Sequence, residues 1–403
     1  MRSSVIPIPK NKTGDLGDST NYRPISLGTV FGKILERLLQ PELLKYIKVD
    51  DAQFGFRPGL STDSAIFSLK QIVGHYTSRE TSVYACFLDL SRAFDLVNYD
   101  ILWSKLACLK VPPELLNLLR YWYDNQTNNV RWGDTTSNNY KLECGVRQGG
   151  LTSPDLFNAY INDLIVGLRQ TKVGCHIGGL CVNSLSYADD MVLLSPSIRG
   201  LRKLLSVCED YANANGLKYN VKKTEMMVFR AGKGPRNVPN VFLNGSAVRV
   251  VDHFRYLGHI MSGDLRDDRD MERERRALAV RCNMLGRRFR RSSKSVRTLL
   301  FKTFCQGLYT CQLWTNYLKK SYNAIRVQYN DAFRILMGLP RYCSASGMFA
   351  AARVPDFFAV LRSWVASFWQ RLSESSNEIL KVACEGFAGS IFRHWRSLHQ
   401  AVV

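Results

Sequence analysis

Cysteine motifs, membrane-length apolar runs and repeats are missing from this sequence of 403 residues. Its 11 cysteines form no Cys-x-x-Cys pair and no Cys/His spacing typical of zinc sites, which argues against a structural zinc domain. Their number is odd and no secretory leader precedes them, so we expect free thiols in a reducing compartment. No apolar run approaches the roughly 20 residues that cross a bilayer, and no internal repeat or low-complexity tract is present. The sequence therefore disfavours membrane-spanning, disulfide-stapled and repeat architectures.

Acidic residues are scarce relative to basic ones. The chain has 55 Lys and Arg against 34 Asp and Glu, a formal net charge of +21, which predicts a polyanionic partner. Residues 275–302 contain ten basic residues and no acid. One apolar stripe at helical spacing runs through this stretch, made of Leu278, Cys282, Leu285 and Phe289. Such a helix is expected to pack on a core and face phosphates, and a membrane-surface helix is disfavoured because large apolar anchors are sparse.

The order of the expected elements indicates an α+β protein. Hydrophobic residues make up 46% of the chain, which fits a folded protein with two or three subdomains. Apolar spacing predicts helices over 28–47 and 62–77, a helix followed by a polar hairpin over 113–144, and three helices over 264–340. The tail, 341–403, is helical and aromatic. Because strands and helices do not alternate regularly, an antiparallel sheet is expected.

Two adjacent acids, Asp189 and Asp190, lie between two short runs of strand-forming residues. This pattern predicts a β-hairpin with both carboxylates at its turn. Side by side in an apolar hairpin, the carboxylates would repel each other, and the pKa of at least one would rise. A divalent cation removes that repulsion, and hard carboxylate oxygens suit Mg²⁺. A solvated surface turn is the alternative for this pair taken alone.

A third acid, Asp89, ends a continuous apolar run typical of a strand that is covered on both faces. A carboxylate at the end of a buried strand is unfavourable unless it binds something. Beside Asp189 and Asp190 on neighbouring strands, it would complete a set able to hold two metal ions about 4 Å apart for nucleotidyl transfer. Asp95 precedes a helical stretch at about 96–109, and we interpret it as a helix N-terminal acid rather than a ligand.

Eight short segments make the sequence resemble the reverse transcriptases of non-LTR (LINE-type) retrotransposons, and the jockey-like branch most of all. They occur in the family's order and spacing, and together they cover roughly residues 5–260. The basic region that follows resembles the family's thumb more loosely. The segments are IPIPK (6–10), NYRPISL (21–27), QFGFRPG (53–59), FLDLSRAFD (87–95), GVRQGGLTSP (145–154), YADD (187–190), NVKKTE (220–225) and YLG (256–258).

The resemblance implies a right-hand polymerase with fingers, an antiparallel-sheet palm and a helical thumb. The fingers would span 1–80 together with 111–144, and the palm that contains the acids would span 81–262. The basic helical thumb would span 263–340. This leaves 341–403 as a helical C-terminal segment without an assigned role.

The reaction that the resemblance implies is attack of a primer 3′-hydroxyl on the α-phosphate of a dNTP, directed by an RNA template. Asp89 and Asp189 would ligate two Mg²⁺ ions, for which Mn²⁺ can substitute, and Asp190 would lie close by. The expected partners are template RNA, a DNA primer or target, and dNTPs, and no membrane. The expected location is a cytoplasmic ribonucleoprotein that acts in the nucleus and is not secreted.

Around the nucleotide, Lys10 and Arg23 match finger positions that embrace the triphosphate, since a guanidinium fork suits phosphate oxygens. Lys12 could replace Lys10, and a structural salt bridge is the alternative for Arg23. In the family, the position of Phe94 walls the sugar pocket and blocks a ribose 2′-hydroxyl. A core phenylalanine is the alternative there.

Three further segments and the thumb carry implied contacts. Gln148 can donate to and accept from template or nucleotide, and Gly149 lets backbone approach the nascent base pair. Lys223 is a candidate for neutralising the leaving group, with a solvated charge run as the equal alternative. The turn formed by Tyr256, Leu257 and Gly258 resembles the one that holds the primer end, although a buried strand end would look the same. In the thumb, the expected primer–template contacts are Arg287, Arg288, Arg290 and Arg291.

Three other classes compete with this interpretation. An RNA-dependent RNA polymerase usually shows Gly-Asp-Asp, whereas this chain has Ala188 before the acids, and Phe94 favours dNTPs. A group II intron maturase would normally continue into a maturase thumb and DNA-binding region, which is not recognisable here. A catalytically silent nucleic-acid-binding remnant is the third class. With no endonuclease domain before Val5 and no zinc knuckle near Val403, we expect a truncated copy.

Overall fold

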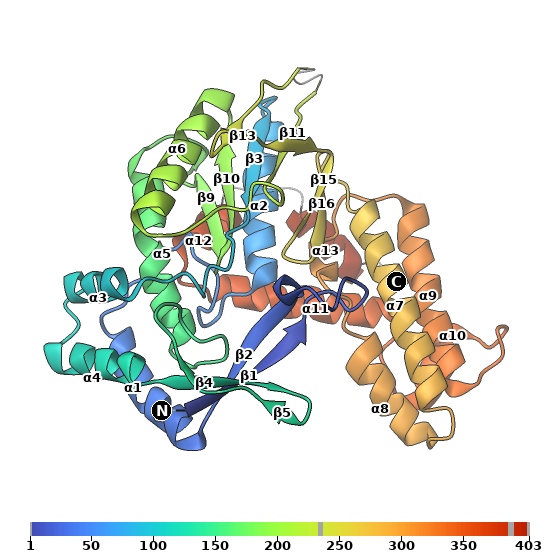
Figure 1. Cartoon of the computed structure of the whole chain (residues 1–403). Helices are drawn as coiled ribbons and strands as arrows, with labels where there is room; N and C mark the ends of the chain where they lie inside the picture. Colours follow the sequence, from blue (N-terminus) through green and yellow to red (C-terminus); the bar gives the residue numbers. More distant parts are fainter. Residues whose placement is uncertain (1, 233–236, 386–390, 401–403) are drawn as a thin grey trace.

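A five-stranded sheet forms the centre of the molecule in the computed structural model, which describes residues 2–232, 237–385 and 391–400 (Figure 1). Its strand order is β14-β11-β3-β10-β9. Neighbouring strands pair antiparallel, except that β14 runs parallel to β11. The strands are β3 (Val83–Leu88), β9 (Ser184–Tyr187), β10 (Asp190–Ser195), β11 (Glu225–Phe229) and β14 (Arg249–Val251). This sheet, here called the palm sheet, confirms the predicted α+β class.

Helices and a hairpin cover the palm sheet because its central strands are apolar on both faces. Helices α2 (Thr62–Thr77), α5 (Ser153–Gln170) and α6 (Ile198–Ala214) pack against it. The hairpin of β15 (His253–Tyr256) and β16 (His259–Ser262) joins them, with the Phe254 ring stacked 4.1 Å from that of Phe87. Both predicted helices of the first 80 residues therefore form, and the second lies against the palm sheet.

A second sheet, the finger sheet, lies beside the palm (Figure 1). Its strand β1 pairs antiparallel with β2 and parallel with β4. The predicted polar hairpin forms here, with Trp132 paired to Thr135 across its turn. The strands are β1 (Arg2–Pro9), β2 (Tyr22–Gly28), β4 (Thr127–Trp132), β5 (Thr135–Thr136) and β6 (Tyr140–Lys141). The helices near them in the chain are α1 (Val30–Leu44) and α4 (Pro113–Asp124), and α3 (Tyr99–Cys108) packs on α5 and α4.

Three helices form the predicted thumb: α7 (Asp268–Arg288), α8 (Lys294–Cys305) and α9 (Lys319–Met337). They pack around a hydrophobic core of their own, separate from that of the palm. The expected apolar stripe on α7 faces this core through Leu278, Cys282 and Leu285. Phe289 is exposed and does not join the core, because the helix ends at Arg288. Figure 1 shows the thumb helices standing to one side of both sheets.

The C-terminal segment links the two cores. Helix α11 (Phe357–Ser373) runs beneath the palm toward the thumb (Figure 1). Its first half contributes Phe357 and Leu361 to the thumb core, and its second half contributes Phe368 and Leu372 to the palm core. Helices α12 (Glu378–Glu385) and α13 (Ile391–Gln400) also pack into the palm core. This segment therefore holds thumb and palm together, a role that the sequence did not reveal.

The remaining elements are short. All 11 cysteines are free thiols, as expected. In the described ranges, none of the helices combines the length and apolar character needed to cross a bilayer. The short elements are η1 (Ser19–Asn21), β7 (His176–Ile177), β8 (Leu180–Cys181), β12 (Phe242–Leu243), β13 (Ser246–Ala247), α10 (Ala345–Ala352) and η2 (Cys311–Leu313).

Candidate active site

A tight turn between β9 and β10 carries the adjacent acids, as the sequence predicted. Tyr187 pairs with Asp190 across the turn, which leaves Ala188 and Asp189 as its two central residues. Ala188 has a φ of +58°, in the left-handed region that residues with a Cβ seldom adopt. Such a backbone persists only where the surrounding structure holds it.

The side chain of Gln53 holds this turn. Its Oε1 accepts hydrogen bonds from the backbone N–H groups of Ala188, at 2.9 Å, and Gly55, at 2.8 Å. Its Nε2 donates to the Ala188 carbonyl oxygen at 3.2 Å. Gln53 is fully buried, so these bonds are shielded from water. The sequence did not indicate a role for Gln53. Its place in the family-like segment 53–59 was the one sign that the residue matters.

Asp89 follows β3, the strand that pairs with β10. Leu88 pairs with Met191, so the antiparallel register brings Asp89 beside Asp190. Together with Asp189, these acids line one open cavity of about 1650 Å³. The strand order therefore brings acids that are distant in the sequence to one cavity.

The carboxylates lie in surroundings that disfavour their charged forms. Burial raises the pKa of Asp89, while Lys223, whose Nζ lies 3.9 Å from Asp89 Oδ2, opposes the rise. Burial also raises the pKa of Asp189, and the charge of Asp89 adds to that effect. Burial and then the two neighbouring acids raise the pKa of Asp190 to about 6. The site therefore favours a cation.

The donor chemistry fits Mg²⁺, which prefers hard oxygen ligands. Within the described ranges, however, no group of three His, Cys, Asp or Glu side chains is gathered closely enough to hold a metal ion. The strand register thus places the acids side by side without drawing their side chains onto one point. The assignment of Asp89, Asp189 and Asp190 as metal ligands stays a prediction.

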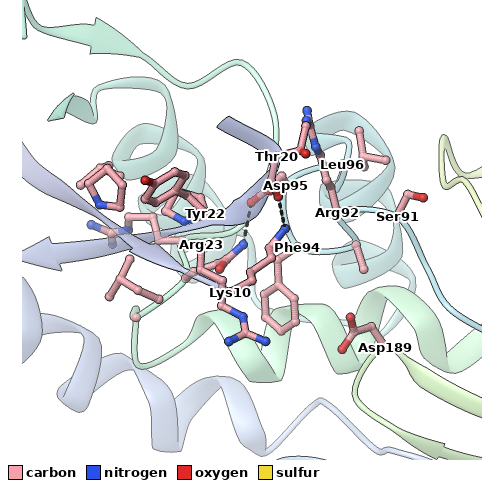
Figure 2. A pocket seen from close by; sticks show the side chains of 18 of the residues that line it. Lys10, Thr20, Tyr22, Arg23, Ser91, Arg92, Phe94, Asp95, Leu96 and Asp189 are labelled. Carbon is pink, nitrogen blue, oxygen red and sulfur yellow. Dashed lines mark hydrogen bonds between the residues drawn. The ribbon is translucent and has the colours of Figure 1, made fainter. Parts of the chain in front are cut away.

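Two basic side chains from the finger sheet reach the same cavity (Figure 2). Lys10 follows β1, and its charge opposes the rise in the pKa of Asp89. Arg23 lies in β2, and its charge opposes the rise in the pKa of Asp189. Of the two candidate lysines, Lys10 is the one that lines the cavity, so the structure favours it over Lys12.

Phe94 lies on the cavity wall near the acids (Figure 2). Its ring stacks on that of Phe157 in α5, with 4.6 Å between centroids, and meets the ring of Phe56 edge-on at 6.2 Å. These contacts fix the ring in place while leaving it half-exposed to the cavity. A rigid ring in this position suits a steric gate, and that role stays a prediction.

Asp95 has a different role from the one that we expected. Helix α3 begins at Tyr99 and is capped by Asn98, so Asp95 is outside its first turn. The interpretation of Asp95 as a helix N-terminal acid is wrong because turns occupy residues 91–96. Asp95 Oδ1 instead accepts a hydrogen bond from Gln148 Nε2 at 3.0 Å. The contact orients the Gln148 amide within the cavity.

Gly149 permits a close backbone approach, but to the protein itself. Its φ is +114°, and a Cβ there would lie 2.8 Å from the carbonyl oxygen of Ser26 in β2. The Ser26 N–H in turn donates to the Gln148 carbonyl at 2.7 Å. The glycine therefore locks the 145–154 segment to the finger sheet.

The predicted primer-contact turn connects β15 to β16. The side chain of Tyr256 is 2% exposed, so it belongs to the core and is not available to a ligand. Leu257 and Gly258 at the turn itself are half-exposed. The four expected thumb contacts lie at the end of α7 and in the turn that follows, all exposed: Arg287, Arg288, Arg290 and Arg291.

Comparison with known proteins decides the family. The family model described as reverse transcriptase (RNA-dependent DNA polymerase) matches residues 8–261, more than half of the chain. The chain belongs to the reverse transcriptase family. The resemblance to non-LTR, jockey-like enzymes is confirmed by its relatives.

The chain is 25% identical over 399 residues to the RNA-directed DNA polymerase from mobile element jockey of Drosophila funebris, covering 94% of this chain and 42% of that protein. It is 28% identical over 267 residues to the retrovirus-related Pol polyprotein from type-1 retrotransposable element R2 of Popillia japonica, covering 64% of this chain and 37% of that protein. The chain thus spans about two fifths of the length of these relatives.

Among solved structures, the chain is similar to apo telomerase from Candida tropicalis, with a TM-score of 0.50 and 13% identity. The match covers 94% of this chain and 63% of the telomerase chain. At this identity the likeness concerns the fold alone. It supports the predicted right-hand architecture.

We expect Gly55→Ala to destabilise the reverse transcriptase by about 3 kcal/mol, because the new methyl group would overlap the Ala188 amide, which cannot move without breaking the Gln53 bonds. Urea unfolding measures the effect. Gly167→Ala is the matched control, since a Cβ there meets no atom within 4 Å in α5, and it should raise stability by up to about 1 kcal/mol. Equal stability of the two variants would contradict the role of Gly55.

Asp190 should make stability depend on pH. Its pKa is about 6 when folded and ordinarily near 4 when unfolded, so the folded state binds more protons between these values. The contribution of Asp190 to the free energy of unfolding therefore decreases as the pH rises from about 4 to about 6, and it stays constant above about pH 6. In the presence of a chelator, the melting temperature of Asp190→Asn should rise relative to that of wild type as the pH increases over that range. A pH-independent difference would refute the perturbed carboxyl.

Proposed function

We propose that this chain is the RNA-directed DNA polymerase of a non-LTR retrotransposon, extending a primer 3′-hydroxyl with dNTPs on an RNA template. The observation that carries the proposal is the gathering of Asp89, Asp189 and Asp190 at one cavity that Lys10 and Arg23 also line. Carboxylates opposite basic side chains suit a reaction in which a metal-bound triphosphate is positioned and its charge is stabilised.

Asp89 and Asp189 would hold divalent metal, Mg²⁺ with Mn²⁺ as a substitute, with Asp190 beside them. Bound there, the metal supplies Lewis acidity toward the primer hydroxyl and the triphosphate. The other charged residues orient the substrate: Lys10 and Arg23 bind phosphate oxygens from the finger side. Lys223 approaches from the palm and would balance charge on the leaving group.

Nucleic acid would occupy the rest of the cavity and the face of the thumb. The Gln148 amide, oriented by Asp95, is placed to contact the nascent pair. Leu257 and Gly258 would hold the primer end. Phosphates would lie along the exposed arginines of the thumb, in keeping with the net charge of +21: Arg287, Arg288, Arg290 and Arg291.

The proposed partners are therefore RNA, a DNA primer and dNTPs. We propose the boundaries given above for fingers, palm and thumb, with α2 assigned to the palm because it packs there. We also propose a ribonucleoprotein that assembles in the cytoplasm and acts in the nucleus, supported by the 11 free thiols, which suit a reducing compartment.

Primer extension tests the proposal. Purified protein, an RNA template with an annealed DNA primer, dNTPs and Mg²⁺ should yield extended primer, and Asp189→Asn should lower the rate at least about 1000-fold, since charge stabilisation is the largest catalytic contribution. Asp134→Asn, an exposed turn aspartate, is the matched control and should extend normally. If folded wild type binds the duplex but does not extend it, the chain is a binding remnant and the proposal fails.

Phe94→Val should relax sugar discrimination. The shortened side chain opens the cavity wall where a ribose 2′-hydroxyl would meet the ring, so the ratio of kcat/KM for dCTP over CTP should fall at least about 10-fold. Single-nucleotide incorporation measures the ratio. The Phe56→Val variant, altered at the neighbouring exposed ring, serves as the comparison. An unchanged ratio in Phe94→Val would rule out the gate.

A further inference from the structure

The turn between β15 and β16 is strained and held from the thumb. Leu257 has a φ of +46° and Gly258 has a φ of +85°, so both turn residues are left-handed. For a leucine this conformation is unfavourable, and it persists only where neighbouring groups enforce it. The enforcing residue is Tyr309, which lies just after α8.

Tyr309 makes two hydrogen bonds with its hydroxyl. The Oη lies 2.6 Å from the Leu257 carbonyl oxygen, to which it donates, and 2.8 Å from Oγ1 of Thr62 at the start of α2. A phenol carries one proton, so the Thr62 hydroxyl donates to Tyr309 in this arrangement. One side chain from the thumb thus connects the hairpin turn to a palm helix.

The ring of Tyr309 is as closely fitted as its hydroxyl. A Cβ on Gly258 would lie 3.1 Å from Tyr309 Cε1, so the ring occupies the space that the glycine leaves free. The guanidinium of Arg273 in α7 lies 5.7 Å from the ring centroid. The turn therefore contacts a ring that is itself fixed by the thumb.

The next residue anchors the other side of the turn. Thr310 is left-handed, with a φ of +62°, and its hydroxyl lies 2.9 Å from Nδ1 of His259, the first residue of β16. The same hydroxyl lies 3.3 Å from Asp270 in α7, whose Oδ2 also accepts a hydrogen bond from the Trp314 indole at 2.8 Å. All of these polar side chains are buried, which makes the contact rigid.

The held turn lies close to the catalytic turn. Burial raises the pKa of the Tyr187 hydroxyl, and the neighbouring Tyr309 adds to that effect. The ring of Tyr256, directly before the held turn, lies 5.5 Å from that of Phe87 in β3, the strand that Asp89 follows. Displacement of the hairpin would therefore also displace residues beside the acids.

We propose that Tyr309 is a positioning residue. Its hydroxyl fixes the position of the Leu257–Gly258 turn and so aligns the primer 3′ end with the catalytic acids. The inference rests on the proposed polymerase function. The thumb carries the side chain that holds the turn. A change in the position of the thumb would therefore also change the alignment of the primer end.

The test is steady-state and burst kinetics of Tyr309→Phe in the full chain, which keeps the ring and removes the hydroxyl. At saturating duplex, kcat per titrated active site should fall about 10-fold, as expected for loss of a positioning hydrogen bond. The Kd for the primer–template duplex and the KM for dNTP should stay within about 2-fold, since neither group contacts Tyr309 directly. Tyr342→Phe, at a tyrosine 91% exposed, is the matched control and should match wild type.

Thr62→Val gives a second route, because it removes the hydroxyl partner of Tyr309 from the palm side and should lower kcat about 3-fold. Two outcomes overturn the positioning role. One is a lower number of titrated active sites with an unchanged kcat per site, and the other is an unchanged kcat in both variants. A wild type that does not extend primers overturns the proposed function and this inference with it. A wild type that extends beside an unimpaired Tyr309→Phe overturns the inference alone.

Discussion

The position of the adjacent acids Asp189 and Asp190 depends on one backbone conformation that a buried amide maintains. Ala188 is left-handed, and Gln53 satisfies both its N–H and its carbonyl group. The segment around Gln53 is itself fixed to β9, since Ser186 donates to the Ala52 carbonyl and accepts from the Phe54 N–H, both at 2.8 Å. The turn is thus held by a neighbouring chain segment and does not depend on its own residues alone. Any change that frees this amide would release the acids.

Charge organises the same cavity in two zones. Acids at the end of β3 and in the β9–β10 turn have raised pKa values because burial and mutual repulsion disfavour their ionised forms. Basic side chains from the finger sheet, Lys10 and Arg23, line the opposite zone and partly compensate. A cation suits the first zone, and phosphates suit the second. Acids of the palm and basic side chains of the finger sheet thus line the same cavity.

Two hydrophobic cores give the molecule its larger geometry, and α11 contributes to both. The thumb therefore does not hang from the β15–β16 hairpin alone. The loop after α8 adds Tyr309 and Thr310 to that hairpin, and Arg371 of α11 donates to Asp63 of α2 at 2.6 Å. Thumb, palm and hairpin are joined at several polar contacts, of which the Thr310–His259 bond is buried, so their relative placement is set by directional bonds as well as by apolar packing.

Local patterns in the sequence determined the elements and the acids. Apolar runs predicted β3 and β10, helical spacing predicted the thumb, and the placement of Asp89, Asp189 and Asp190 beside those runs predicted one acidic site. What the sequence could not show are contacts between residues far apart along the chain, such as Gln53 with Ala188, separated by 135 positions. The apolar spacing predicted the helix α1 but not what covers it, because its Phe31 is 83% exposed. Periodicity reports which face of an element is apolar, whereas hydrogen-bond partners and the covering of that face are decided only when the tertiary structure brings distant segments together.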